Sequence, residues 1–203
     1  MSAPPPDLLA FHIGFVVRDV DAAMDCYRRM LGVDGWRVHE IHRAKAPWAE
    51  RYTDARIKIA FGRGVGLTFE LIQVLEGKTQ HSEFLEAHGE GVQHIGLWSH
   101  DVRASVEAAV AQGARIVTAL VDPNDQAVVQ LTPGSSTDEI LRAIPHDRLA
   151  YVDPGLATVQ LEFVGPGTGL RDWLQEDYDR IIVPPPWEGQ MFVKGPLMGL
   201  PPP

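Results

Sequence analysis

One short phrase of chemically active residues occurs twice in this chain. His-Ile-Gly begins at His12 and again at His94, and an aspartate follows seven positions after each histidine, at Asp19 and Asp101. The offset between the two copies is the same for the histidine and for the aspartate. Repetition at a fixed offset is typical of a repeated structural unit. We therefore expect two copies of one supersecondary unit, each with a histidine on its first element.

A glutamate near the end of each unit adds a second kind of donor. Glu70 interrupts the apolar segment LTFELIQV, and Glu162 interrupts TVQLEFV. A carboxylate buried in such a strand is costly unless it is ionised against a metal ion or strong hydrogen-bond donors. Two imidazoles and two carboxylates suit a borderline divalent ion, with one or two positions left for water or substrate. Because side chains alternate along a strand, each histidine shares a face with the glycine two residues later.

The elements that position these residues can be predicted from hydrophobic periodicity. In the first unit, apolar and β-branched runs predict strands at residues 11–17, 36–43, 56–61 and 67–74. Asp19 or Asp21 can cap a helix after the first strand, and Gly32 ends that helix. The glycine-rich segment 62–66 reads as a turn. The order of elements is β-α-β-β-β.

The same order returns in the second half of the chain. There the strands are expected at residues 93–99, 115–121, 149–152 and 158–164. Asp101 takes the cap position and Gly113 ends the helix. A helix is also expected at 136–144, inside a less regular stretch. The chain then divides into a first module, a linker helix, a second module with an insertion near 122–145, and a proline-rich tail, at residues 10–77, 78–90, 91–166 and 167–203.

Residues 10–166 resemble the vicinal oxygen chelate superfamily, which includes glyoxalase I, methylmalonyl-CoA epimerase, extradiol dioxygenases and bleomycin resistance proteins. The resemblance rests on four segments: HIGFVVRDVDAAMDCYRRMLGV, LTFELIQVLEG, GVQHIGLWSHDV and YVDPGLATVQLEFVGP. It implies an α+β fold in which two paired βαβββ modules form a cupped, eight-stranded mixed sheet around a metal site. The implied ligands of one divalent ion (Zn, Co, Ni, Mn or Fe) are His12, Glu70, His94 and Glu162.

The implied ligand set also indicates a class of reaction. Four ligands of the His-Glu-His-Glu type resemble glyoxalase I and the epimerases, in which a metal polarises a carbonyl group and a carboxylate moves an α-proton. Glu162 and Glu70 are therefore the candidate catalytic bases of an isomerase, epimerase or lyase acting on a small carbonyl substrate. An extradiol-type dioxygenase, with Glu70 outside the ligand set, is one alternative. A protein that sequesters a small molecule is the other, and the four candidate ligands count against it.

Three further residues are candidates for lining the substrate pocket. His42, in HEIH, shares a strand face with Glu40, and Trp98 and Tyr151 lie on strands beside the expected site. For each of these three residues, a structural role is the simpler interpretation. A CoA thioester is not favoured as substrate, because only 18 lysines and arginines are present and few of them cluster.

Composition limits the partners and the compartment. The formal net charge of −9 disfavours nucleic acid and anionic membrane surfaces, and no stretch approaches the length of a membrane helix. The single cysteine, Cys26, excludes an intrachain disulfide and fits a reducing compartment. With no signal-peptide pattern at the N-terminus, we expect a cytoplasmic protein. The apolar, proline-rich tail is expected to lie against the body or against the second subunit of a homodimer.

Overall fold

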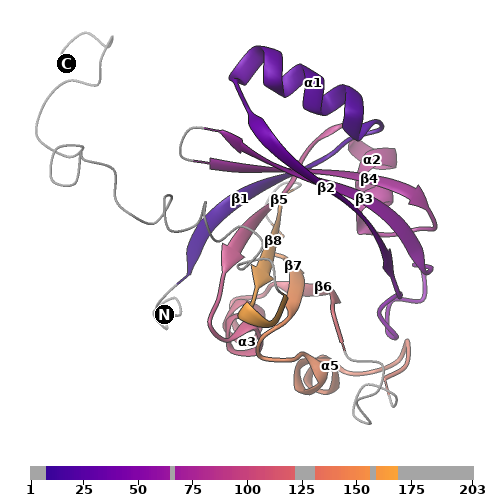
Figure 1. Ribbon diagram of the computed structural model, residues 1–203. Helices are drawn as coiled ribbons and strands as arrows, with labels where there is room; N and C mark the ends of the chain where they lie inside the picture. Colours follow the sequence, from indigo (N-terminus) through magenta and orange to yellow (C-terminus); the bar gives the residue numbers. More distant parts are fainter. Residues whose placement is uncertain (1–7, 65–66, 122–130, 156–158, 169–203) are drawn as a thin grey trace, which may run out of the picture.

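Eight strands form one curled mixed sheet, shown in Figure 1. This computed structural model describes residues 8–64, 67–121, 131–155 and 159–168. The strands are β1 (Leu9–Val16), β2 (Asp34–Arg43), β3 (Ala55–Gly64), β4 (Leu67–Glu76), β5 (Gly91–Trp98), β6 (Arg115–Ala119), β7 (Leu149–Asp153) and β8 (Gln160–Val164). The helices are α1 (Val20–Leu31), α2 (Gln80–His88), α3 (Val102–Ala111) and α5 (Thr137–Ala143), and a short 3₁₀ helix covers Pro166–Thr168.

The strand order is symmetric about the middle of the sheet. It runs β2-β3-β4-β1-β5-β8-β7-β6, so that each half contains one βαβββ module. Within the modules, β1 is parallel to β4 and β5 is parallel to β8, whereas β1 and β5 join the two modules as an antiparallel pair. The predicted α+β class and eight-stranded sheet are confirmed.

The repeated aspartates begin the equivalent helices of the two modules. A carboxylate oxygen of Asp19 accepts hydrogen bonds from the backbone N–H groups of Asp21 and Ala22, and Asp101 accepts one from Ala104. These bonds satisfy donors that the first turn of a helix leaves free. Gly32 ends α1 with φ of 66°, in the left-handed region that favours glycine. The predicted N-caps are confirmed at both repeats, whereas the C-cap of α3 is Gln112, one residue before the predicted Gly113.

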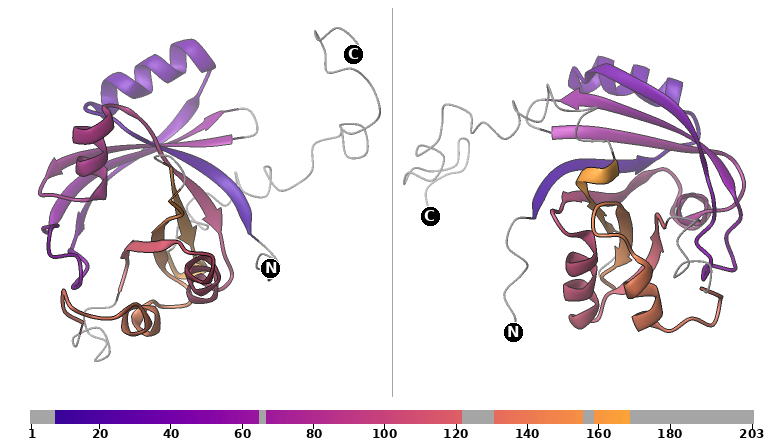
Figure 2. Two further views of the ribbon diagram at one scale, coloured as in Figure 1. Left: turned by 180° about the vertical axis from the view of Figure 1, so that it is seen from behind. Right: turned by 60° about the horizontal axis from the view of Figure 1, so that its bottom comes forward.

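The helices of the two modules cover the outside of the curled sheet. Helix α1 packs on β3 and β4, where Val20 lies in one cluster with Ala60 and Leu71. Helices α3 and α5 pack beside β6, β7 and β8 at the other end of the molecule, as Figures 1 and 2 show. Because side chains alternate along β3 and β4, the neighbours of Ala60 and Leu71 point to the inner face of the sheet. That inner face contains the candidate site.

Most strand ends differ from the predicted ones by one or two residues, and the end of β3 differs most. Strand β3 continues to Gly64, because Gly62 and Gly64 pair with β4, so the predicted turn at 62–66 is shorter than expected. Strand β6 ends at Ala119 instead of residue 121. The helix expected within the insertion is present as α5.

Several predicted features fall on residues that the structure does not describe. They include the centre of the 62–66 turn, the start of the 122–145 insertion, and the tail from residue 169 onward with its predicted helix at 170–178. Within the described residues, none of the helices combines the length and the apolar character needed to cross a membrane.

Candidate metal centre

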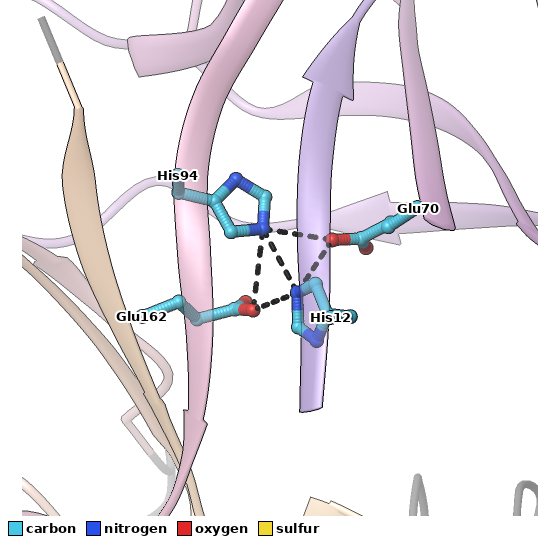
Figure 3. A group of neighbouring side chains, drawn as sticks. All are labelled: His12, Glu70, His94 and Glu162. Carbon is cyan, nitrogen blue, oxygen red and sulfur yellow. Dashed lines mark hydrogen bonds and ion pairs between the residues drawn. The ribbon is translucent and has the colours of Figure 1, made fainter. Parts of the chain in front are cut away.

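The two histidines and the two glutamates meet inside the curled sheet. They project from the four central strands, with Glu70 on β4, His12 on β1, His94 on β5 and Glu162 on β8 (Figure 3). Both imidazoles are fully buried, and the glutamates are 4% and 3% exposed. One donor atom from each residue lies within 4.8 Å of all the others. The structure thus brings together all four residues that the sequence indicated.

Strand register explains why one glutamate and one histidine meet across an intervening strand. Gly14 on β1 lies opposite Glu70 of β4 on one side and opposite His94 of β5 on the other. Strands two apart in a sheet are separated by about 9.5 Å, a gap that two side chains can bridge only by leaning across the strand between them. A glycine in that strand leaves the space open.

The second module repeats this row. Gly96 on β5 lies between His12 of β1 and Glu162 of β8. A Cβ atom added at Gly96 would lie 1.9 Å from the His12 ring, and one added at Gly14 would lie 1.8 Å from the His94 ring. The imidazole rings therefore occupy the space that any other residue at these glycines would fill.

The donor atoms have the spacing of ligands around one ion. His12 Nε2 lies 3.1 Å from Glu70 Oε2 and 2.9 Å from Glu162 Oε2, and the corresponding distances from His94 Nε2 are 2.9 and 3.4 Å. The two Nε2 atoms are 3.0 Å apart. Donors about 2.1 Å from a shared ion are about 3.0 Å apart at octahedral angles and about 3.4 Å apart at tetrahedral angles. The residues present fit a divalent metal ion.

The side chains that contact each imidazole ring away from its Nε2 atom differ between the two histidines. Gln93 Oε1 lies 2.8 Å from His94 Nδ1 and accepts a hydrogen bond from its N–H group, so that Nε2 is the nitrogen directed at the cluster. At the equivalent position in the first module stands Phe11, whose ring packs edge-on against His12. Among the described residues, His12 Nδ1 has no hydrogen-bond partner.

The four groups of the cluster favour their charged forms in the metal-free protein, although burial disfavours those forms. Burial disfavours the protonated imidazoles, but hydrogen bonds to Glu162 and Glu70 outweigh it and raise the pKa of His12 to about 9. The pKa of His94 is raised by the same carboxylates against the same burial. Burial also disfavours both carboxylate anions, yet the imidazoles hold the pKa of Glu70 below its usual value and that of Glu162 well below it. Without a metal ion, protons on the histidines balance the two carboxylates.

A pocket of about 380 Å³ opens directly beside the two carboxylates. Its volume lies within the range of small-molecule sites. Glu70 and Glu162 line it, whereas the histidines lie behind them. The remaining described residues of the lining are His39, Ile41, Arg43, Ile57, Ile59, Phe61, Ile72, His81, Leu120, Arg148, Leu149, Tyr151 and Thr168.

Of the three predicted pocket residues, one lines this pocket. Tyr151 does, with its ring edge-on to His94 at 5.2 Å, and burial together with the Glu162 and Glu70 charges raises the pKa of its hydroxyl well above 10. Trp98 is instead 3% exposed and packs in the core. His42 is exposed and lines two neighbouring hollows that contain none of the four donors. The prediction for His42 is wrong because the opposite face of β2, with His39, points to the pocket.

Sequence reasoning missed five polar residues of the pocket lining, namely His39, Arg43, His81, Arg148 and Thr168, and two of these are the most informative. Arg43 is the last residue of the predicted strand that contains His42, and it shares the inward face with His39. His81 is 1% exposed and lies on α2, with its ring 6.3 Å from that of His94 and 5.6 Å from that of Tyr151. Alternation along β2 could have identified Arg43 if the inward face had been known. Nothing in the polar segment around His81 marks it as buried.

Paired βαβββ modules with a histidine and a glutamate from each, meeting at the module junction, define a glyoxalase-like class of fold. Residues 11–128, more than half of the chain, match the family model described as the glyoxalase/bleomycin resistance protein/dioxygenase superfamily. The chain belongs to this superfamily, which confirms the resemblance noted in the sequence.

Solved structures with a similar fold have low sequence identity to this chain. A mutant of 4-hydroxymandelate synthase from Streptomyces coelicolor is 19% identical, with a TM-score of 0.51, over 78% of this chain and 48% of that one. Methylmalonyl-CoA epimerase from Mycobacterium tuberculosis is 21% identical, with a TM-score of 0.49, over 84% of this chain and 97% of that one. These similarities concern the fold.

The glycines opposite the histidines provide a test of the geometry. Gly14→Ala and Gly96→Ala should each displace one imidazole ring, because the new methyl group would overlap it. We expect a loss of about 1–3 kcal/mol in stability and at least about tenfold weaker metal binding. Gly91→Ala is the matched control, since a Cβ at this β5 glycine meets nothing within 4 Å. Thermal melts and metal titrations measure both effects. Normal metal affinity in both variants would contradict the geometry.

The pKa of His12 predicts how metal uptake depends on pH. A metal ion needs the unprotonated Nε2, but in the metal-free protein His12 keeps its proton up to about pH 9. Below about pH 9, metal affinity should therefore rise by at least about tenfold per pH unit around neutral pH, because His12 alone releases about one proton per ion bound and His94, whose pKa is also raised, adds to the release. In the metal-free protein the same group stabilises the fold below pH 6.5, and this stabilisation is lost as pH rises through about 9. Calorimetry in two buffers measures the proton release, and a pH-independent affinity would exclude this account.

Proposed function

We propose that this protein is a metal-dependent isomerase, epimerase or lyase that removes an α-proton from a small carbonyl substrate. The observation that carries the proposal is the pair of buried carboxylates, Glu70 and Glu162, which converge from opposite modules and line one pocket. A base on each side of a substrate allows a proton to be taken from one face and returned to the other.

His12, Glu70, His94 and Glu162 would hold one divalent ion, with Zn, Co, Ni, Mn and Fe all compatible with two nitrogen and two oxygen donors. Such an ion, when bound, withdraws electron density from a carbonyl oxygen and so makes the neighbouring C–H bond more acidic. The protein's own residues then provide position and proton transfer.

The two carboxylates differ in their surroundings, although their positions are equivalent. Glu162 lies opposite Tyr151 of β7, whereas Glu70 lies opposite Phe61 of β3. A tyrosine hydroxyl beside one carboxylate and a phenyl ring beside the other give the two bases unequal hydrogen bonding. Glu162 is thereby oriented by a polar neighbour, and Glu70 faces an apolar one. Buried apolar side chains, among them Ile57, Phe61 and Ile72, line the pocket and make the surroundings of the transferred proton less polar.

A ring-cleaving dioxygenase is the principal alternative, and the position of Glu70 argues against it. That chemistry uses two histidines and one carboxylate, leaving several open positions on iron. Here Glu70 lies as close to the two imidazoles as Glu162 does, at 2.9 and 3.1 Å. Oxygen uptake with a catechol, measured on the iron-loaded protein, separates the two functions. The complete donor set also argues against a protein that only sequesters a small molecule.

The metal requirement can be tested by composition. Purified protein reloaded after treatment with a chelator should contain about one divalent ion per chain. His12→Ala and His94→Ala should each reduce the metal content to a small fraction, because each removes a donor and opens a cavity. His42→Ala serves as the control, since His42 lies outside the cluster. Elemental analysis provides the measurement, and unchanged metal content in both cluster variants would disprove the proposed function.

The catalytic role of the carboxylates can be tested by deuterium exchange. Glu70→Gln and Glu162→Gln each keep an oxygen donor but remove a base, so much of the metal should remain. Exchange of α-protons from a panel of hydroxyketones, 2-oxo acids and thioesters in deuterated water should fall by about two orders of magnitude. Glu107→Gln, an exposed change on α3, should have no effect. Full exchange activity in both single variants would exclude carboxylate bases.

A further inference from the structure

We propose that Arg43 forms a carboxylate-binding subsite in this pocket, so that the substrate is a carbonyl compound with an apolar body and one carboxylate group. This inference rests on the proposed function for the carbonyl group, but the carboxylate subsite can be tested separately. It follows from the position of Arg43, from the charges that line the pocket and from the polar groups around it.

Arg43 is placed to reach a ligand from the pocket wall. It is the last residue of β2 and shares the inward face of that strand with His39 and Ile41, which line the same pocket. Its Nε atom is buried, and no hydrogen-bond partner for it occurs among the described residues. A buried guanidinium nitrogen without a partner is costly. A carboxylate is the group whose two oxygens match the geometry of a guanidinium.

Within the described lining of this pocket, no acid is left free to pair with Arg43. Among the described lining residues, the only acids are Glu70 and Glu162, and the metal cluster uses both. Arg148, the other lining cation, donates to the Gly167 carbonyl. With a divalent ion neutralising the two carboxylates, the pocket therefore has an excess of positive charge. An anionic group on the substrate would balance it.

The polar groups of the pocket lie within electrostatic reach of Arg43. Burial, then the His94 charge, then the Arg43 charge lower the pKa of His81 to about 3, so that this imidazole stays neutral. The Arg43 charge also opposes the burial that raises the pKa of Tyr151. His81 Nδ1 is buried, and no partner for it occurs among the described residues. Arg43 and His81 together give a charged and a neutral contact to one ligand.

Apolar side chains form the rest of the pocket wall, so the body of the ligand should also be apolar. Isoleucines from β2, β3 and β4, together with leucines and Phe61, face the same space. Removal of apolar ligand surface from water on such walls supplies binding energy without directional contacts. Among the described lining residues the cations are Arg43 and Arg148, and Arg148 already donates to the Gly167 carbonyl, so the pocket suits a single carboxylate better than a phosphate dianion.

Matched ligands that differ only in charge test the subsite. We would measure the binding of benzoylpropionate and benzoylbutyrate, each against its methyl ester, to the Co²⁺-loaded and to the metal-free full-length protein by calorimetry. The acid should bind at least about tenfold more tightly than the ester. Arg43→Met should reduce this preference to about threefold or less, with the Co²⁺ content and spectrum unchanged. Arg43→Lys should retain part of the preference.

Arg29→Met is the charge-matched control, because Arg29 is exposed on α1 and lies outside the pocket lining. It should leave the preference unchanged. Equal affinity for acid and ester in the unaltered protein, or no binding of either, would overturn the subsite. A preference that survives in Arg43→Met would do the same, because the carboxylate would then bind elsewhere. Failure to bind Co²⁺ would disprove the metal-dependent function instead, while the acid–ester comparison on metal-free protein would still decide the role of Arg43.

Discussion

The antiparallel register between β1 and β5 is the constraint on which the site depends. Ile13 pairs with Ile95 at the centre of the molecule, so each histidine falls opposite the glycine of the other module. A shift by one residue would place the two histidines on opposite faces of the sheet. Gly14 also pairs with Glu70 of the parallel strand β4, and Gly96 also pairs with Glu162 of the parallel strand β8. Each row of paired residues that crosses β1 and β5 therefore ends at one of the two glutamates. The phrase His-Ile-Gly is therefore a structural unit, in which the glycine of one copy provides room for the histidine of the other.

Concentrating four ionisable groups in the core makes the fold depend on what balances them. The carboxylates are held ionised by the imidazoles, and the imidazoles are held protonated by the carboxylates, all against the cost of burial. A buried ion pair is weak evidence for stability, because desolvation can exceed the attraction. A divalent ion would replace protons with a charge that all four donors share, and it would couple metal binding to folding. The cluster is thus better explained by ligand binding than by stabilisation of the metal-free protein.

Repetition made the donor set predictable from the sequence, whereas the pocket was largely not predictable. Equivalent positions in two modules identified His12, Glu70, His94 and Glu162, and the two capping aspartates fixed the phase of each module. Periodicity along β2 correctly separated His39 from His42, but it could not tell which of them points inward, because that depends on how the sheet curls. His81 reaches the site only because α2 packs against β1, β4 and β5. Contacts of this kind arise from tertiary packing and leave no periodic signal in the chain.

Departures from the twofold arrangement make the two sides of the four-donor cluster chemically different. Phe61 and Tyr151 occupy equivalent places beside the two glutamates, and Phe11 and Gln93 occupy equivalent places beside the two histidines. In both comparisons the polar residue belongs to the second module. A substrate between two identical halves would have no preferred orientation, whereas these unequal neighbours distinguish its two faces. Arg43 adds a positive charge from the first module, in which the residues beside the donors, Phe61 and Phe11, are apolar. The repeated modules thus explain how the four donors come together, and the differences between the modules make the two sides of the pocket unequal.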